Sequence, residues 1–242
     1  ELVPRDVEVL KEEVKTIKEK LSDVDFINIP DLLSCDTRSW DGANIAKAYF
    51  DDVVPHLRAM DFDFTKELPI KDKLREYNIK EVLVIEGDPP QSMLYQVYPT
   101  ISTDIIKKFS EEMPEITVYA GIDQYRSSMK EEEYRIRRKQ LAGAKGFFTQ
   151  PFFDMRYLEM YADLLDGLDI YWGVSPVLSE RSVSYWRNKN NVIFPKDFEP
   201  TLEWNIEFAR KVIDFARKHN HNVYLMPIKA KIMPYLEGVF AK

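Results

Sequence analysis

The chain has 242 residues, 45% of them hydrophobic and 31% charged, a composition typical of a globular domain with a sizeable core. Its net charge of -7 argues against nucleic-acid and membrane-surface partners, which select basic faces. Cys35 is the only cysteine, which excludes an internal disulfide and fits a reducing cytoplasm, and no apolar stretch reaches the length of a transmembrane helix.

Helices and strands alternate along the chain. Asp6 is placed to cap a first helix, in which Leu10, Val14 and Ile17 recur at helical spacing. Short apolar runs predict seven strands, at residues 25–29, 53–60, 81–87, 116–120, 146–150, 170–174 and 222–228. Polar and charged amphipathic segments predict the helices between them, at residues 42–52, 66–77, 103–112, 129–141, 155–165, 179–186, 201–219 and 231–240.

This alternation predicts an α/β fold with a parallel sheet, and specifically a (β/α)8 TIM barrel that fills residues 1–242 as a single domain. Seven strands are one short of a closed barrel. We expect the first strand to lie upstream of Glu1 or to be missing. A doubly wound open sheet is the alternative, but the chain lacks the glycine-rich nucleotide loop of that fold.

Polar residues follow or end most of the predicted strands. In a barrel these positions meet at one rim, where the active sites of this fold are built. Counting Glu1 as the end of the upstream strand, the set is Glu1, Asp31, His56, Asp88, Asp123, Gln150, Ser175 and Lys229. No group of His, Cys and carboxylate residues has metal-ligand spacing, so we expect no metal.

Five segments together resemble the methylenetetrahydrofolate reductase family. The family has, in order, Glu-Phe-Phe-Pro-Pro, Pro-His-Leu, Arg-Gly-Asp-Pro, Ile-Thr-Gln-Phe-Phe-Phe-Asp and Gly-Ile-x-Pro-Val stretches. The matching segments here keep that order and spacing: Glu1 to Arg5, Pro55 to Leu57, Glu86 to Pro89, Phe148 to Asp154, and Gly173 to Val177.

The resemblance implies a flavin-dependent reductase that passes a hydride from reduced FAD to a methylene-pterin, giving the methyl form. By position, Glu1 is the general acid that protonates the folate nitrogen, and Asp88 tunes the flavin and binds the pterin. Gln150 binds the pterin ring through its amide. The resemblance also assigns cofactor-binding residues, namely His56, Asp88, Arg135, Arg138 and Lys139, the last three for the FAD pyrophosphate.

The chain departs from the family pattern at residues 29–31 and 121–126. An alternative function therefore follows: a relative without flavin that binds a pterin, either as a partner subunit or as a pterin-dependent methyltransferase in one-carbon metabolism. FMN in place of FAD is a further alternative. The expected partners are folate or another pterin, NAD(P)H or a redox protein as electron donor, and either a second copy of the chain or a larger complex.

Overall fold

The computed structural model describes residues 1–90, 92, 94–228 and 230–241. It consists of two compact units, each described here by itself. The first unit comprises Glu1–Gly121 and Arg137–Lys145, and the second comprises Ile122–Ile136 and Gly146–Lys242. The organisation of residues 1–242 as a single domain stays a prediction, and the predicted strand-end residue Lys229 lies outside the described residues.

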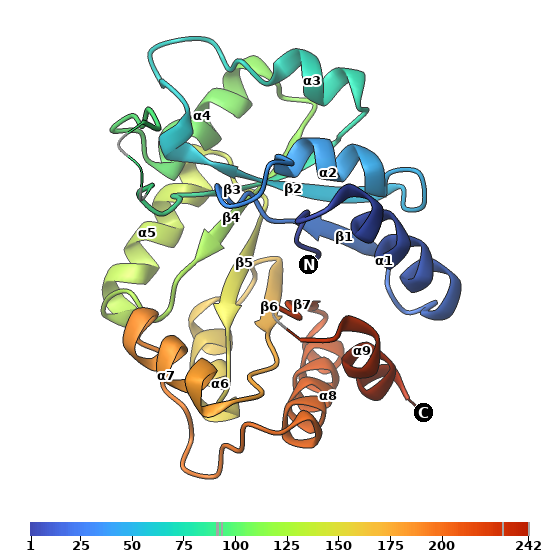
Figure 1. Ribbon diagram of the computed structural model, residues 1–242. Helices are drawn as coiled ribbons and strands as arrows, with labels where there is room; N and C mark the ends of the chain where they lie inside the picture. Colours follow the sequence, from blue (N-terminus) through green and yellow to red (C-terminus); the bar gives the residue numbers. More distant parts are fainter. Residues whose placement is uncertain (91, 93, 229, 242) are drawn as a thin grey trace. The chain divides into compact units, whose positions relative to one another are not determined.

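The first unit carries four parallel strands that pair in chain order (Figure 1). They are β1 (Phe26–Ile29), β2 (Asp52–Arg58), β3 (Glu81–Ile85) and β4 (Thr117–Ile122). The register places Ile29 opposite Pro55, and His56 opposite Leu83. His56 is therefore inside β2, two residues before its end, and not at the strand end where the sequence pattern placed it.

The helices of this unit are α1 (Val7–Lys20), α2 (Ser39–Ala46), α3 (Lys71–Glu76) and α4 (Ser102–Glu112), with a short 3-10 turn, η1, at Ala59–Asp61. α1 confirms the sequence prediction. The Asp6 carboxylate accepts hydrogen bonds from the backbone N–H groups of Glu8 and Val9, each at 2.9 Å, and Leu10, Val14 and Ile17 are buried.

Two helices differ from the predicted ranges for local reasons. α2 begins at Ser39, before residue 42, because the buried Asp31 carboxylate accepts the Ser39 N–H at 3.2 Å and satisfies the first turn. α3 begins at Lys71, well after residue 66, because Pro69 has no N–H and disfavours helical geometry in the residue before it.

The strands of the first unit have two distinct faces. Gly42 of α2 lies so close to β1 that a Cβ there would stand 3.1 Å from Cγ2 of Ile29, so Ile29 points toward α2. Side chains alternate along a strand, which turns Asn28 to the opposite face. The register carries this face to His56 and then to Arg58 in β2. We call it the inner face.

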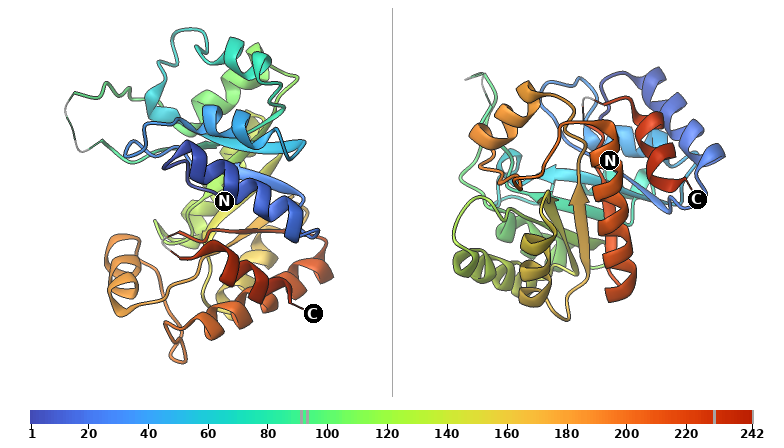
Figure 2. Two further views of the ribbon diagram at one scale, coloured as in Figure 1. Left: turned by 45° about the vertical axis from the view of Figure 1, so that its right-hand side comes forward. Right: turned by 90° about the horizontal axis from the view of Figure 1, so that it is seen from below.

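The second unit has three parallel strands, again paired in chain order: β5 (Gly146–Pro151), β6 (Ile170–Val174) and β7 (Asn222–Leu225). Its helices are α6 (Met155–Leu164), α7 (Glu180–Lys189), α8 (Leu202–His219) and α9 (Ile232–Phe240), while α5 (Met129–Ala142) contributes residues to both units. Figure 2 shows α8 and α9 side by side, and these two helices pack together.

Parallel strands that alternate with helices confirm the predicted TIM-barrel-like α/β class. Within each unit the strand order follows the chain and never reverses, whereas a doubly wound sheet has a reversal point. The described residues form seven strands, as the sequence predicts. In the part of the chain that the structure describes, no helix combines the length and apolarity needed to cross a bilayer.

Replacing Gly173 of β6 by alanine should destabilise the second unit. A Cβ at this position would lie 2.6 Å from the Thr149 carbonyl oxygen of β5, a backbone atom that cannot turn aside. We expect Gly173→Ala to lower the free energy of unfolding in urea by about 2 kcal/mol, the usual cost of overpacking. Gly121→Ala is the control, because its Cβ would only touch Ile85 at 3.4 Å. Equal stability of the two variants would contradict this close approach.

Candidate functional site

A buried cluster of three polar side chains lies on the inner face of the first unit. His56 Nε2 stands 3.0 Å from Asn28 Nδ2 and 3.7 Å from a carboxylate oxygen of Glu1. The Glu1 and His56 side chains are 6% and 9% exposed, and Asn28 is buried. The segment before α1 is held beside β1, because the Leu2 N–H donates to the Asn28 carbonyl at 3.0 Å. The structure thus brings together two of the predicted site residues, Glu1 and His56.

Burial sets the protonation of this cluster. Loss of water raises the pKa of the Glu1 carboxyl above its usual value, since the charged form is the one that burial disfavours. The same effect lowers the pKa of His56 to about 3. His56 is therefore neutral at physiological pH, and Glu1 keeps its proton to a higher pH than an exposed carboxyl. The site presents a neutral imidazole next to an acid that can donate a proton.

Asn28 is only partly satisfied. Its Nδ2 meets His56, but its Oδ1 is buried without a hydrogen-bond partner among the described residues. A buried acceptor that forms no bond costs about 1–3 kcal/mol, so such atoms are uncommon. This one lies directly beside the Glu1 and His56 pair.

A network of two arginines and two aspartates connects the carboxyl ends of β1, β2 and β3. Arg38 binds Asp31 through two bonds, at 2.9 and 2.5 Å, and Asp61 through a third, at 2.8 Å. Arg58 then approaches Asp61 at 3.3 Å and donates to the Asp88 carbonyl at 2.8 Å. Because each charge has an opposite partner, the network can be largely buried.

This network fixes the loop that carries Asp88. Gly87 has a φ of +87°, and a Cβ there would come within 3.1 Å of Cβ of Arg58, so the loop crosses Arg58 closely. The Asp88 carbonyl is tied to the guanidinium, while the Asp88 side chain is exposed. Asp88 thus follows β3, next to the strand that carries His56 and Arg58.

Gln150 belongs to β5 in the second unit. The residue is exposed, and its backbone carbonyl accepts a hydrogen bond from the Gln124 side chain at 2.7 Å. That bond fixes the backbone of Gln150. The assignment of Gln150 to pterin binding stays a prediction.

The cations assigned to the FAD pyrophosphate already contact protein groups. Lys139 is buried, and its ammonium donates to the Gly121 carbonyl at 2.6 Å. Arg135 pairs with Glu131 at 2.7 Å and Glu132 at 3.5 Å. Arg138 is exposed and also has an interaction within the protein. Arg135 is paired with carboxylates and Lys139 is buried, so neither presents an available charge to a doubly charged pyrophosphate. A phosphate role for these residues therefore stays a prediction without structural support.

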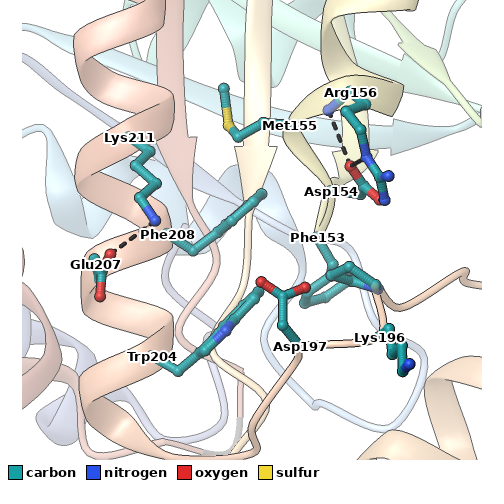
Figure 3. A pocket seen from close by; sticks show the side chains of 11 residues that line it. Phe153, Asp154, Met155, Arg156, Lys196, Asp197, Trp204, Glu207, Phe208 and Lys211 are labelled. Atoms are coloured by element: carbon teal, nitrogen blue, oxygen red, sulfur yellow. Dashed lines mark hydrogen bonds and ion pairs between the residues drawn. The ribbon is translucent and has the colours of Figure 1, made fainter.

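The second unit contains a cavity of about 790 Å3 between the start of α6 and α8 (Figure 3). Phe153, Trp204 and Phe208 line it, with Trp204 stacked on Phe208 at 5.2 Å. Four of its charged side chains pair with one another, Arg156 with Asp154 at 2.6 Å and Lys211 with Glu207 at 2.7 Å, and Lys196 and Asp197 also line it. The cavity has aromatic walls and charges of both signs, and it includes none of the predicted site residues.

The sequence prediction missed Asn28, Arg58, Arg38 and Asp61. Asn28 and Arg58 each lie next to buried apolar residues of a predicted strand. A single polar residue in such a run is common, because side chains alternate between the two faces of a strand, so neither residue stood out. The signal that could have found Arg58 is its spacing of two residues from His56, which puts both on one face of β2. Over the described residues, no group of three His, Cys, Asp or Glu side chains could hold a metal ion.

Comparison with known proteins supports the resemblance to the methylenetetrahydrofolate reductase family, at the level of a divergent relative. No family model matches. The 5,10-methylenetetrahydrofolate reductase of Buchnera aphidicola subsp. Schizaphis graminum is 22% identical over 147 residues, which is 59% of this chain and 50% of that protein. The alignment thus spans about half the length of that relative.

Solved structures share the fold. A Clostridium thermocellum protein that binds two copies of 5-methyl-5,6,7,8-tetrahydrofolic acid superposes with a TM-score of 0.62 and 13% identity, over 96% of this chain and 86% of that one. Oxaloacetate acetylhydrolase superposes with a TM-score of 0.53 and 10% identity, over 99% and 88% of the two chains. At these identities the similarity establishes the barrel-like fold alone.

His56→Gln should change how stability depends on pH. Folded His56 stays neutral down to a pH of about 3, whereas unfolded His56 takes up a proton near its ordinary pKa of 6.5. The wild-type free energy of unfolding should therefore fall by about 2 kcal/mol relative to the variant as pH is lowered from 8 to 5. Making Glu1→Gln in both proteins removes the titration of the neighbouring Glu1 from the comparison. Urea titrations across this range measure the effect, and parallel curves for the two proteins would contradict a buried neutral imidazole.

Proposed function

We propose that this divergent relative of the methylenetetrahydrofolate reductase family binds a reduced folate-type pterin on the inner face of its first unit. The observation that carries the proposal is the buried Glu1 carboxyl 3.7 Å from the neutral His56, where burial raises the pKa of the acid above its usual value. The sequence similarity to a folate-reducing enzyme supports it, as does the shared fold with a protein that binds 5-methyltetrahydrofolate.

The chemistry of a reduced pterin matches the groups on this face and in the loop that follows β3. Its 2-amino-4-oxopyrimidine edge presents two adjacent N–H donors, which a carboxylate such as Asp88 accepts with both oxygens. Its ring and bridge nitrogens are weak bases, which a protonated carboxyl such as Glu1 can protonate. The network of two arginines and two aspartates holds the Asp88 loop in place before a ligand binds, which reduces the entropy cost of ordering the loop on binding.

Flavin-dependent reduction of a methylene-pterin to the methyl form is the second candidate, with Glu1 as proton donor and NAD(P)H or a redox protein as electron source. The similarity to a 5,10-methylenetetrahydrofolate reductase favours it. The engaged state of Arg135 and Lys139 favours instead a relative without FAD, acting as a pterin-binding subunit or a pterin-dependent methyltransferase. The absorbance spectrum of the purified protein, recorded before and after addition of FAD or FMN, separates the two candidates. A bound-flavin spectrum supports the reductase, and its absence supports the relative without flavin.

Binding of 5-methyltetrahydrofolate should depend on Asp88. Asp88→Asn exchanges one acceptor oxygen for an amino group that faces the N–H donors of the pterin. We expect its Kd, measured by isothermal titration, to rise at least about tenfold, the loss of one charge-assisted hydrogen bond. Glu19→Gln on the exposed surface of α1 is the control and should leave the Kd unchanged. Unchanged affinity in Asp88→Asn would contradict the proposed site.

Glu1 should make that binding depend on pH. The affinity of the wild-type protein should fall as pH rises through the raised pKa of Glu1, because the ionised form has no proton to donate. Glu1→Gln presents a neutral donor at every pH, so its affinity should stay within about threefold of the wild-type value at low pH and lose the decline. A decline of equal size in both proteins would assign the titration to another group.

A further inference from the structure

We infer that Asn28 is a positioning residue that holds His56 in the tautomer with its proton on Nδ1, and so keeps the proton of Glu1 for the ligand. The inference rests on the proposed function for the role of Glu1. Its structural part, the tautomer of His56, concerns the free protein and stands apart from pterin binding.

Asn28 touches both partners of the acid site. Its backbone carbonyl accepts the Leu2 N–H at 3.0 Å and so anchors the residue that follows Glu1. Its side chain meets His56 Nε2 at 3.0 Å from the neighbouring strand. The Ser39 hydroxyl donates to the His56 carbonyl and fixes the backbone of the same residue from α2. One buried asparagine therefore sets the relative position of the carboxyl and the imidazole.

The direction of the Asn28 to His56 bond decides which ring nitrogen has the proton. A neutral imidazole has one donor and one acceptor nitrogen. When the Asn28 amide N–H donates to Nε2, that nitrogen is the acceptor and Nδ1 holds the proton. This is the orientation in the structure, and it leaves Asn28 Oδ1 unbonded among the described residues.

The opposite orientation would change Glu1. With Oδ1 turned to His56, Nε2 would hold the proton and donate it to Oδ1, and the positive end of this N–H dipole would lie near the Glu1 oxygen, which is 3.7 Å from Nε2. A positive dipole at that place favours the ionised carboxylate and lowers its pKa, opposing the effect of burial. With Nε2 as acceptor of the Asn28 bond, the imidazole places no N–H near Glu1, so nothing from His56 opposes the rise in the Glu1 pKa that burial causes.

Asn28 Oδ1 then has a use in the complex. It is a buried acceptor next to the acid, so an N–H of the bound pterin would satisfy it. The missing hydrogen bond destabilises the free protein, and a ligand N–H that donates to Oδ1 would remove this penalty on binding.

Nitrogen NMR of the histidines tests the tautomer directly. The chain has three histidines, so long-range proton–nitrogen spectra are simple, and His56→Gln identifies the His56 signals by their loss. We expect wild-type His56 to show protonated Nδ1 and unprotonated Nε2 from pH 5 to 8. Asn28→Leu removes the donor and should give a mixture of tautomers. Asn28→Asp offers only acceptor oxygens and should place a proton on Nε2. Ser39→Ala, which alters only the backbone contact of His56, should leave the tautomer unchanged.

Binding measurements then test the effect on Glu1. In Asn28→Leu, the decline of 5-methyltetrahydrofolate affinity with pH should move to lower pH by about one unit. Protonated Nε2 in the wild-type spectrum would overturn the inference, even if every Asn28 variant failed to fold. So would an Asn28→Leu variant that keeps the wild-type tautomer. If wild-type protein shows the expected tautomer but no pterin binding, the proposed function fails while the assignment of the Asn28 bond stands.

Discussion

The exclusion of water from Glu1 and His56 is the constraint on which the site depends. On the surface the carboxyl would be ionised at neutral pH, the imidazole would titrate near its ordinary pKa of about 6.5, and an ion pair between them would add little stability. Burial on the inner face reverses this outcome, because it raises the pKa of the acid and lowers that of the base. The imidazole is therefore neutral at physiological pH, and the carboxyl keeps its proton to a higher pH than an exposed one, which is the property that the proposed protonation of a ring nitrogen needs.

The rest of the first unit holds this pair and the Asp88 loop in place. Parallel pairing of β1 with β2 puts Asn28 and His56 on one face, and α2 covers the other. The ion pairs that run from Asp31 to Arg58 also fix the Asp88 loop, because Arg58 donates to the Asp88 carbonyl. Gly87 allows this loop to pass close to Arg58. Asp31 lies where the chain departs from the reductase family, and here it caps α2 and binds Arg38.

The sequence was sufficient for the fold class but for only part of the site. Apolar runs of strand length and the 3–4 spacing in α1 follow from burial, so strands, helices and their parallel order could be predicted. The family motifs singled out Glu1, His56 and Asp88; the structure brings Glu1 and His56 together, and the role of Asp88 stays a prediction. The role of Asn28 could not be predicted, since it comes from pairing across strands, which position in the sequence does not record. For Arg58 the sequence contains one signal, its spacing of two residues from His56, but it does not show the bonds of Arg58 to Asp61 and the Asp88 carbonyl. The bonds of Lys139 and Arg135 could not be predicted for the same reason. The sequence of a basic helix is the same whether its cations bind a ligand or pair with groups of the protein.

Proton uptake on ligand binding tests the central claim most directly. Isothermal titration of 5-methyltetrahydrofolate in buffers of different ionisation enthalpy counts the protons that enter the complex. At a pH above the pKa of Glu1, the wild-type protein should take up close to one proton on binding, and Glu1→Gln should take up none. Equal proton uptake by the two proteins would contradict a protonated Glu1 in the complex.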